Sequence, residues 1–441
     1  MPSMPCLPSP TCQLPMGFSI QRLQGRHLHV HKAASSLLAA AASAAPSEVT
    51  VPRQPGVTDG VWSKADVQLV KDAIDFSRPS QRDLRAEHGN ILLGRSLTNL
   101  QEFAETHGQP KFRGKQLYDG LLHGAQNVLD INNVPIAWRQ HLAQQGVLSG
   151  RSSIHREVKS KDGTTKFLLR LADNHVVETV GIPLDDSNKQ RLTVCVSSQV
   201  GCPMRCTFCA TGKGGFARNL RQHEIIDQVM TVQERMGARV SNVVFMGMGE
   251  PLLNLRAVTA AARFINADLG IGARHITVST VGVPNAIGML ARALTGPPLQ
   301  LTLAVSIHAP NQAVRQKIIP SAKAYPLDAL LQDCQKFLEV TGRRVTFEYT
   351  LLAGVNDSPA QAEELADRLG NFRLRGSHIN LIPWNAVDDA DFTRPSRNAV
   401  FAFRRALEAK GHPVSVRVTR GQDADAACGQ LRNRNQKTPL S

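Results

Sequence analysis

The chain has 441 residues, 42% of them hydrophobic and 20% charged, which suits a large globular core with smaller attached domains. Its eight unevenly spaced cysteines exclude a disulfide framework and indicate a reducing compartment. No stretch is apolar enough for long enough to span a bilayer, so we expect no membrane association. The formal net charge of +15 favours a polyanionic partner, nucleic acid above all, although charge that only maintains solubility is the alternative.

The N-terminal residues 1–47 have the composition of an organelle transit peptide. No acidic residue precedes Glu48, while Ser, Ala, Arg and His are abundant. This composition predicts import into a chloroplast, with the mitochondrion as the alternative. Residues 48–94, which include a candidate helix over 63–76, are interpreted as a linker of unknown role.

Residues 95–150 are predicted to form a small helical domain. Apolar residues recur there at helical spacing, first over 97–103 and again over 117–122. The basic residues Lys111, Arg113 and Lys115 lie between these two stretches beside a glycine. They suit contacts with RNA phosphates, and an ordinary solvated helix face is an equally good interpretation. We interpret the domain as an accessory RNA-binding platform.

Residues 151–190 change to the period-two pattern of strands. Alternating segments over 166–170 and 175–182 predict a β-hairpin linker into the next domain. Glu178 interrupts the second apolar strand near its end. A carboxylate in that position is either paired structurally or held as a base with a raised pKa, and the sequence leaves both open.

From residue 191 onward, strands and helices alternate regularly. The predicted strands are 192–196, 240–246, 275–279, 300–306, 344–351, 378–382 and 414–418. The predicted helices between and after them are 220–236, 255–266, 284–293, 311–317, 327–341, 359–369 and 397–410. Six strand–helix repeats predict an α/β fold with a parallel sheet curled into a partial (β/α)6 barrel of the TIM type over 191–431, followed by a basic tail over 432–441.

The segment just past the first predicted barrel strand carries three closely spaced cysteines, Cys202, Cys206 and Cys209. Chemistry in such barrels lies at the C-terminal ends of the strands, where this segment falls. Three thiolates with no fourth cysteine or histidine nearby favour an iron–sulfur cluster that keeps one iron open, because a structural zinc site closes with four protein ligands. Zinc with a distant fourth ligand is the alternative.

Later strands also end in polar or glycine-rich segments, which predicts a shared ligand site on one rim. Glycine lets the backbone approach a ligand closely, and the polar side chains can bind an amino acid or a ribose. His308 taken alone could equally be a satisfied structural histidine. The candidate residues are Gly249 and Glu250 after the second strand, Ser279 after the third, Ser306, Ile307 and His308 after the fourth, and Asn385 after the sixth.

These motifs together resemble a known family. The CxxxCxxC segment after the first strand and the GMGEP segment after the second resemble the radical S-adenosylmethionine (SAM) superfamily. The surrounding segments 194–202, 215–220, 304–311 and 418–431 are similar to the RlmN/Cfr group of adenine methyltransferases, and nearer to its RlmN branch. The resemblance covers roughly residues 97–431, so the N-terminal extension and the short tail inherit no role.

The resemblance implies methylation of carbon 2 of an adenosine in 23S-type ribosomal RNA, with tRNA as a further substrate of some bacterial members. It also implies one 4Fe-4S cluster on Cys202, Cys206 and Cys209, SAM on the rim residues, a one-electron donor such as flavodoxin or ferredoxin, and a monomer. Carbon 2 of adenine is electron-poor and cannot attack the methyl group of SAM as an amine would, so a radical route is required.

Three residues outside the cluster receive roles by the same resemblance. Cys428 matches the cysteine that carries the methyl group, Cys195 matches the thiol that resolves the RNA adduct by forming a disulfide, and Glu178 matches the proton acceptor. Without the family, Cys195 reads as a buried strand cysteine and Cys428 has no assigned role, while Cys334 reads as a core residue.

Three other functions compete with this interpretation. The first is methylation at carbon 8 of the same nucleotide, which uses the same cysteines. The second is a radical SAM reaction on a protein or metabolite, which leaves Cys195 and Cys428 unexplained. The third is a non-enzymatic RNA-binding protein with structural zinc, which predicts a colourless protein, whereas iron–sulfur charge transfer predicts a brown one.

Overall fold

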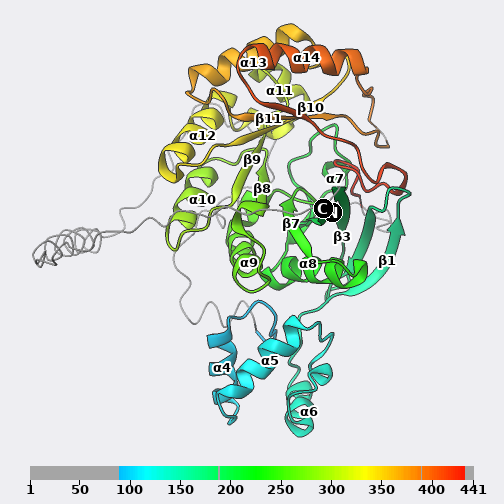
Figure 1. Ribbon diagram of the computed structural model, residues 1–441, viewed down its shortest axis with the longest axis vertical. Helices are drawn as coiled ribbons and strands as arrows, with labels where there is room; N and C mark the ends of the chain where they lie inside the picture. The colour runs from blue at the N-terminus through cyan, green and yellow to red at the C-terminus, as the bar shows by residue number, and fades with distance from the viewer. Residues whose placement is uncertain (1–88, 187–188, 389, 433–441) are drawn as a thin grey trace, which may run out of the picture. The chain divides into compact units, whose positions relative to one another are not determined.

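A computed structural model describes residues 89–186, 189–388 and 390–432 of the chain (Figure 1). The predicted transit peptide over 1–47, the candidate helix over 63–76 and nearly all of the predicted basic tail lie outside these residues. None of the helices in the described part has the length and apolar character needed to cross a membrane.

The N-terminal part of the described chain forms a small helical unit with its own core. Its elements are α4 (Leu97–Thr106), α5 (Phe112–Leu122), the 3-10 helix η1 (Val128–Asp130) and α6 (Ile136–Gln144). Leu100, Leu117 and Leu142 are fully buried together. Gly114 lets α4 and α5 approach, because a Cβ there would lie 2.4 Å from the backbone of Gln101.

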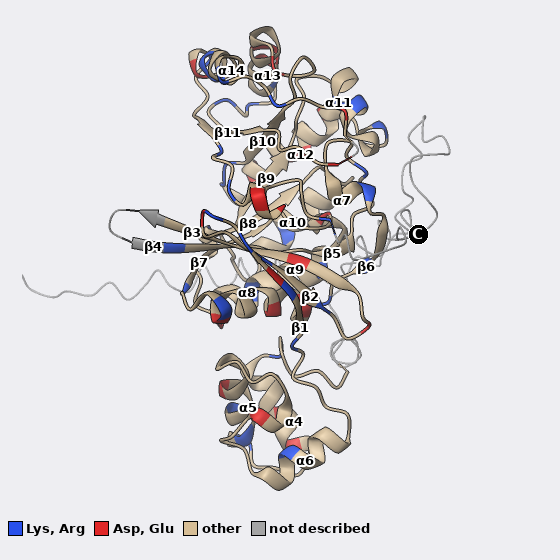
Figure 2. Cartoon of the chain, turned by 90° about the vertical axis from the view of Figure 1, so that its right-hand side faces the viewer, with Lys and Arg blue, Asp and Glu red and all other residues tan. Residues whose placement is uncertain are grey.

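The helical unit begins earlier than the predicted boundary at residue 94. Leu92 is fully buried in the same core, and its backbone N–H donates to the Leu148 carbonyl at 3.0 Å. The prediction that these residues are linker is therefore wrong at this end. Residues 95–150 include five basic and four acidic residues, and both kinds appear on this unit in Figure 2, so its net charge is close to neutral.

Ten strands of the described chain form one sheet, in the order β1, β2, β3, β4, β7, β8, β9, β10, β11, β12. The first four are β1 (Ser153–Lys159), β2 (Thr165–Arg170), β3 (Val176–Asp186) and β4 (Lys189–Cys195). The others are β7 (Val240–Phe245), β8 (Ile276–Thr280), β9 (Thr302–Ser306), β10 (Thr346–Leu351), β11 (His378–Pro383) and β12 (Val414–Val416). Neighbours from β4 to β12 pair in parallel, and β1 and β12 do not pair with each other, so the predicted partial barrel is confirmed.

The predicted hairpin linker is part of this same sheet rather than a separate connection. Strands β1, β2, β3 and β4 pair antiparallel in succession, and Val180 of β3 lies opposite Cys195 of β4. Pairing of β3 covers the edge that β4 would otherwise expose. The antiparallel strands therefore extend the barrel wall beside the cysteine segment.

Helices cover the outer face of the curved sheet (Figure 1). They are α8 (Gln222–Met236), α9 (Leu255–Ala267), α10 (Ala286–Thr295), α11 (Gln312–Ile318), α12 (Leu327–Thr341), α13 (Pro359–Asn371) and α14 (Arg397–Ala409). Because both faces of these strands are covered, consecutive residues along them are apolar and buried, as Leu303, Ala304 and Val305 of β9 are. Cys334 on α12 is fully buried as well, as predicted for a core residue.

After β12 the chain folds back over the sheet as a segment, residues 417–432, that contains one short 3-10 helix, η5 (Gln422–Ala424), and that we call the C-terminal loop. It docks on the turn between β1 and β2, residues 160–164. The Asp162 carboxylate accepts from the Gly421 N–H at 2.9 Å, and the Asp423 carboxylate accepts from the Lys161 N–H at 3.1 Å and from the Ser160 hydroxyl. Side chains on each segment thus accept hydrogen bonds from the other.

Candidate functional site

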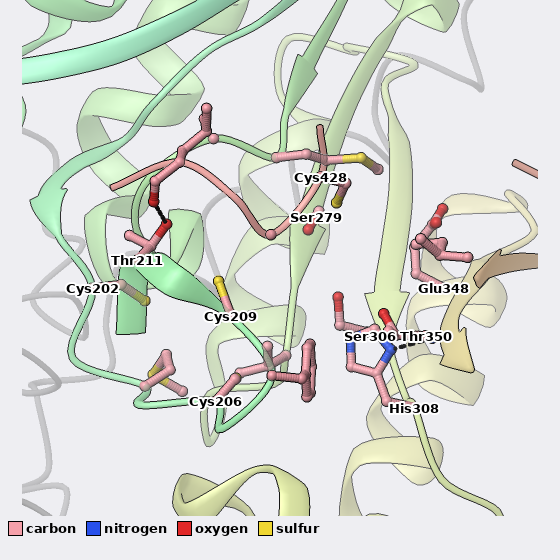
Figure 3. Close-up of a pocket in the computed structure, with 18 of the residues that line it drawn as sticks. Cys202, Cys206, Cys209, Thr211, Ser279, Ser306, His308, Glu348, Thr350 and Cys428 are labelled. Carbon is pink, nitrogen blue, oxygen red and sulfur yellow. Dashed lines mark hydrogen bonds between the residues drawn. The ribbon is translucent and has the colours of Figure 1, made fainter. Parts of the chain in front are cut away.

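The three clustered cysteines line one cavity at the C-terminal ends of the parallel strands (Figure 3). They follow the short strand β5 (Gln199–Gly201) and precede α7 (Ala210–Lys213) and β6 (Phe216–Asn219). The Cys202 N–H donates to the Gly215 carbonyl at 2.8 Å, and the Cys209 N–H donates to the Cys206 carbonyl at 3.2 Å. These bonds fold the segment into a compact loop that presents its sulfur atoms to the cavity.

Seven further residues predicted from the sequence line the same cavity. They are Gly249, Glu250, Ser279, Ser306, His308, Asn385 and Cys428. Ile307 is placed differently: its side chain is fully buried outside the lining, and its carbonyl accepts a hydrogen bond from Arg315 Nε at 3.2 Å. The structure thus brings together residues from the ends of several strands, as the alternating pattern predicts.

Glu250 connects the ends of two neighbouring strands. One carboxylate oxygen accepts from the Leu252 N–H and the other from the Val281 N–H, both at 2.9 Å. Burial raises the pKa of Glu250 to about 7, although these hydrogen bonds oppose the rise. Gly249 has a φ of +108°, and a Cβ there would lie 2.6 Å from Gln199, so only glycine lets this turn close against the cysteine segment.

His308 is held as a neutral imidazole on the rim. Its Nδ1 accepts from the Thr350 N–H at 2.9 Å, which leaves the proton on Nε2. Burial and the nearby Arg315 lower its pKa to about 3. The backbone of His308 has a φ of +55°, and Asn356 Nδ2 secures its carbonyl at 2.7 Å. Such a strained backbone is maintained where the surrounding structure fixes it, often at functional sites.

Cys428 lies at the junction of two cavities. It lines the cavity of the clustered cysteines and also a neighbouring cavity of about 340 Å³ that contains Cys195. Asn385 Nδ2 donates to the Cys428 carbonyl at 3.1 Å, so this amide holds the loop rather than only facing a ligand. Arg417 makes a side-chain hydrogen bond to Cys428.

Cys195 is close enough to Cys428 for the two to interact. Burial and the neighbouring Cys428 raise the pKa of the Cys195 thiol to about 12. A thiol with so high a pKa is protonated at rest and must lose its proton before it can attack another sulfur. The fold therefore brings Cys195 and Cys428, which lie 233 residues apart in the sequence, to the lining of one cavity.

Glu178 lies near this site but lines neither cavity. It is 1% exposed on β3, and its carboxylate lies 3.8 Å from the Lys166 amine. The Lys166 amine also donates to the Asp425 carbonyl of the C-terminal loop at 3.0 Å. Glu178 is thus connected through one lysine to the segment that carries Cys428.

The lining of the cavity of the clustered cysteines also contains residues that sequence reasoning missed, among them Thr211, Glu348, Trp384 and Arg417. Thr211 lies two residues after Cys209 and Trp384 lies directly before Asn385, so both adjoin residues already singled out. Glu348 is the one charged residue of the nearly fully buried strand β10, which is a usable signal for function. Nothing in the local sequence distinguishes Arg417 from the other arginines of this basic chain.

The side chains fit a cluster held by three thiolates. Burial and neighbouring cysteines raise the pKa of both Cys202 and Cys206, so binding of iron displaces protons. Among the described residues, no three His, Cys, Asp or Glu side chains converge closely enough to hold a single metal ion. Three thiols around one cavity suit a larger cluster with an open iron, and the rim residues beside it can bind SAM.

Comparisons with known proteins agree with this geometry. The model of the radical SAM superfamily matches residues 196–368. A curated protein of Parasynechococcus marenigrum (strain WH8102), named probable dual-specificity RNA methyltransferase RlmN, is 56% identical over 350 residues, which cover 78% of this chain and 99% of the relative. A protein of the same name from Synechococcus elongatus is 56% identical over 351 residues, covering 79% and 95%.

A solved structure is similar over the same extent. It is the crystal structure of a radical SAM methyltransferase from Sphaerobacter thermophilus, with 41% sequence identity and a TM-score of 0.71. The alignment covers 78% of this chain and 99% of that one. Fold and sequence therefore agree on one family.

Proposed function

The chain belongs to the RlmN group of radical SAM RNA methyltransferases, and on that basis we propose that it methylates carbon 2 of an adenosine in large-subunit ribosomal RNA of the 23S type. The observation that carries the proposal is the position of Cys428, which lines both the cavity of the clustered cysteines and the cavity of Cys195. A thiol at that junction can meet a methyl donor, a radical and an attacking thiol in turn. The words "dual-specificity" in the names of the relatives support tRNA as a second substrate.

The cofactors provide the reactive species. Cys202, Cys206 and Cys209 would hold the cluster and the rim residues would hold SAM, and the two together would supply a radical able to remove a hydrogen atom from a methyl group. In the proposed reaction Cys428 carries that methyl group on its sulfur, and the carbon radical left after loss of the hydrogen atom adds to carbon 2 of the adenine. The adduct radical then loses one electron, which the oxidised cluster would take up, and the hydrogen of carbon 2 leaves as a proton. Enzyme and RNA are then joined covalently through Cys428.

Cys195 resolves the adduct. Its thiolate attacks the Cys428 sulfur, so that a sulfur–sulfur bond forms and the bond from that sulfur to the methylene carbon breaks. The electron pair stays with the carbon, which takes up a proton and becomes the new methyl group. Glu178 accepts the proton lost from carbon 2. Because Glu178 lines neither cavity, we propose that the C-terminal loop, to which Lys166 donates, shifts before this step.

Variants of the isolated cysteines test this proposal. Cys428→Ala should keep its cluster and transfer no methyl group to RNA. Cys195→Ala should add to adenine and stall, giving a nuclease-sensitive upward shift of the protein on a denaturing gel that is absent from the Cys195→Ala/Cys428→Ala double variant. Cys334→Ala is the matched control, since this buried cysteine lies in the core and lines neither cavity, so it should methylate RNA normally. Full methylation by either active-site variant would show that the thiols are misassigned.

The position of the methyl group needs a separate measurement. Methylation at carbon 8 would use the same cysteines, so gel shifts do not distinguish the two products. Mass spectrometric mapping of nucleosides from ribosomal RNA, with and without the enzyme, should show 2-methyladenosine. The appearance of 8-methyladenosine would show that the enzyme methylates carbon 8 instead of carbon 2. Unmodified ribosomal RNA and tRNA would indicate a substrate of another class.

A further inference from the structure

Arg315 is a fully enclosed cation behind the rim of the cavity of the clustered cysteines. It lies on α11 and is 1% exposed. Its Nε donates to the Ile307 carbonyl at 3.2 Å, and its Nη2 donates to the Val281 carbonyl at 2.5 Å and the Ser306 carbonyl at 3.4 Å. All three acceptors are backbone oxygens at the C-terminal ends of β8 and β9.

These acceptors are neutral, so the charge of Arg315 has no carboxylate counterpart in the hydrogen bonds that hold it. None of the ion pairs formed within the described ranges involves Arg315. The sequence around it explains why: no acidic residue occurs between Asp268 and Asp328, or between Asp186 and Glu224, the stretch that contains the three clustered cysteines. A buried charge without an opposite charge is strongly unfavourable, so its retention needs a reason.

The thiolates of the clustered cysteines would supply the opposite charge that Arg315 lacks. Val281 and Ser306, whose carbonyls accept from Arg315 Nη2, line the same cavity as Cys206. The contact between the two segments is direct, because the Ile318 carbonyl at the end of α11 accepts from both the N–H and the hydroxyl of Thr207, at 3.0 and 3.1 Å. Burial lowers the pKa of Arg315 to about 10, which leaves it charged at neutral pH.

We propose that Arg315 is the fixed counter-charge of the iron–sulfur cluster, a positioning residue whose cation stabilises the cluster and favours its one-electron reduction. This inference rests on the proposed function for the presence of the cluster. Three thiolates on a doubly positive 4Fe-4S core leave one net negative charge, and reduction adds a second. A nearby buried cation interacts more strongly with the reduced form, because the low-dielectric interior screens it weakly. The electron comes from a one-electron carrier in solution.

The chain offers a matched control at the opposite end of the same strand. Arg343 Nε donates to the Leu301 carbonyl at 2.9 Å, just before β9 begins, so it also fixes a strand end through a backbone oxygen. The five residues of β9 separate the two arginines along the strand by about 16 Å. Loss of Arg343 should remove a similar clamp without removing a charge from the surroundings of the cluster.

The test compares Arg315→Gln, Arg315→Lys and Arg343→Gln in the anaerobically reconstituted full chain. Iron content, thermal unfolding and the cluster reduction potential, followed by electron paramagnetic resonance during a redox titration, are measured for each. At the potential where half of the wild-type cluster is reduced, the reduced-to-oxidised ratio of Arg315→Gln should be at least tenfold lower, which is a shift of about 59 mV for one electron. Arg315→Lys and Arg343→Gln should stay within threefold of wild type, whatever their thermal stability.

Two results would overturn the proposal: a wild-type potential in Arg315→Gln with full iron content, or an equal shift in Arg343→Gln. If Arg315→Gln folds and holds no cluster, the Arg315→Lys variant distinguishes a role for the charge from a role in shaping the rim. Retention of the cluster by the lysine variant supports a role for the charge, whereas loss from both folded variants assigns Arg315 to shaping the rim and refutes the counter-charge. Absence of iron from the wild-type protein would instead refute the cofactor assignment.

Discussion

The docking of the C-terminal loop on the β1–β2 turn predicts that Gly421→Ala detaches the segment that carries Cys428. Gly421 has a φ of +69°, and a Cβ there would lie 2.8 Å from the side chains of both Thr164 and Ala426. The backbone conformation costs an L-residue about 1 kcal/mol, and forcing an extra methyl group into a packed contact costs about 1–3 kcal/mol more. The sum of about 2–4 kcal/mol lowers the ratio of docked to undocked loop roughly 30- to 700-fold.

Gly411→Ala is the control for the backbone part of this cost. Gly411 has a φ of +88° and no atom within 4 Å of an added Cβ, so only the cost of about 1 kcal/mol for its conformation applies. Limited trypsin digestion measures the undocked population, because cleavage after Arg420 needs a locally unfolded chain. We expect Gly421→Ala to be cleaved there at least tenfold faster than Gly411→Ala, and single-turnover RNA methylation to slow in parallel. Equal cleavage and equal methylation in the two variants would refute the docking argument.

Three further predictions address the cluster, the pH dependence of docking and the N-terminal segment. Cys206→Ala should be nearly free of iron, since one of only three ligands is lost, and wild-type iron content after reconstitution would contradict the cluster assignment. Burial would raise the pKa of Asp162, but hydrogen bonds from Gly421 and Thr164 lower it to about 2. The ionised carboxylate therefore stabilises docking fully above about pH 4, and this contribution is lost as the pH falls towards 2. Hydrogen exchange of the Gly421 amide, corrected for its intrinsic pH dependence, should accelerate over that interval in the wild type and not in Asp162→Asn. A fusion of residues 1–60 to a fluorescent protein should enter a chloroplast or, as the alternative, a mitochondrion, and a cytosolic signal would argue against a transit peptide.

The barrel and its rim could be predicted from the sequence because both depend on local patterns. Strand and helix candidates alternated at regular intervals, and such a pattern leaves a parallel sheet as the main solution. Parallel strands bring their C-terminal ends to one edge, so Gly249, Ser279 and His308 could be grouped without any knowledge of contacts. The family resemblance then supplied roles that the pattern itself could not, those of Cys195 and Cys428.

Features that depend on contacts between distant segments could not be predicted. Pairing of β3 with β4 in the barrel sheet, burial of Leu92 in the helical unit and the position of Glu178 outside both cavities all depend on how separate segments meet. Arg315 shows the same limit. Its sequence context is an ordinary amphipathic helix, and its burial against carbonyl groups becomes visible only when α11 lies against the cysteine segment.

The way in which the C-terminal loop is held explains how one cysteine can serve several steps. Its residues near the cysteine are mostly alanines and glycines, and its apolar packing is limited to a small cluster in which Ala424, Ala426 and Leu431 meet Val180 and Met248. Individual hydrogen bonds hold the rest, such as those from Asn385 to the Cys428 carbonyl, from Lys166 to the Asp425 carbonyl and from Thr211 to the Leu431 carbonyl. Each such bond contributes a net of about 0.5–1.5 kcal/mol, so the loop is positioned accurately and can still be released. A strand inside the barrel could not move without disturbing its neighbours. The thiol that must meet a methyl donor, a base and Cys195 therefore lies on a segment outside the strands of the barrel.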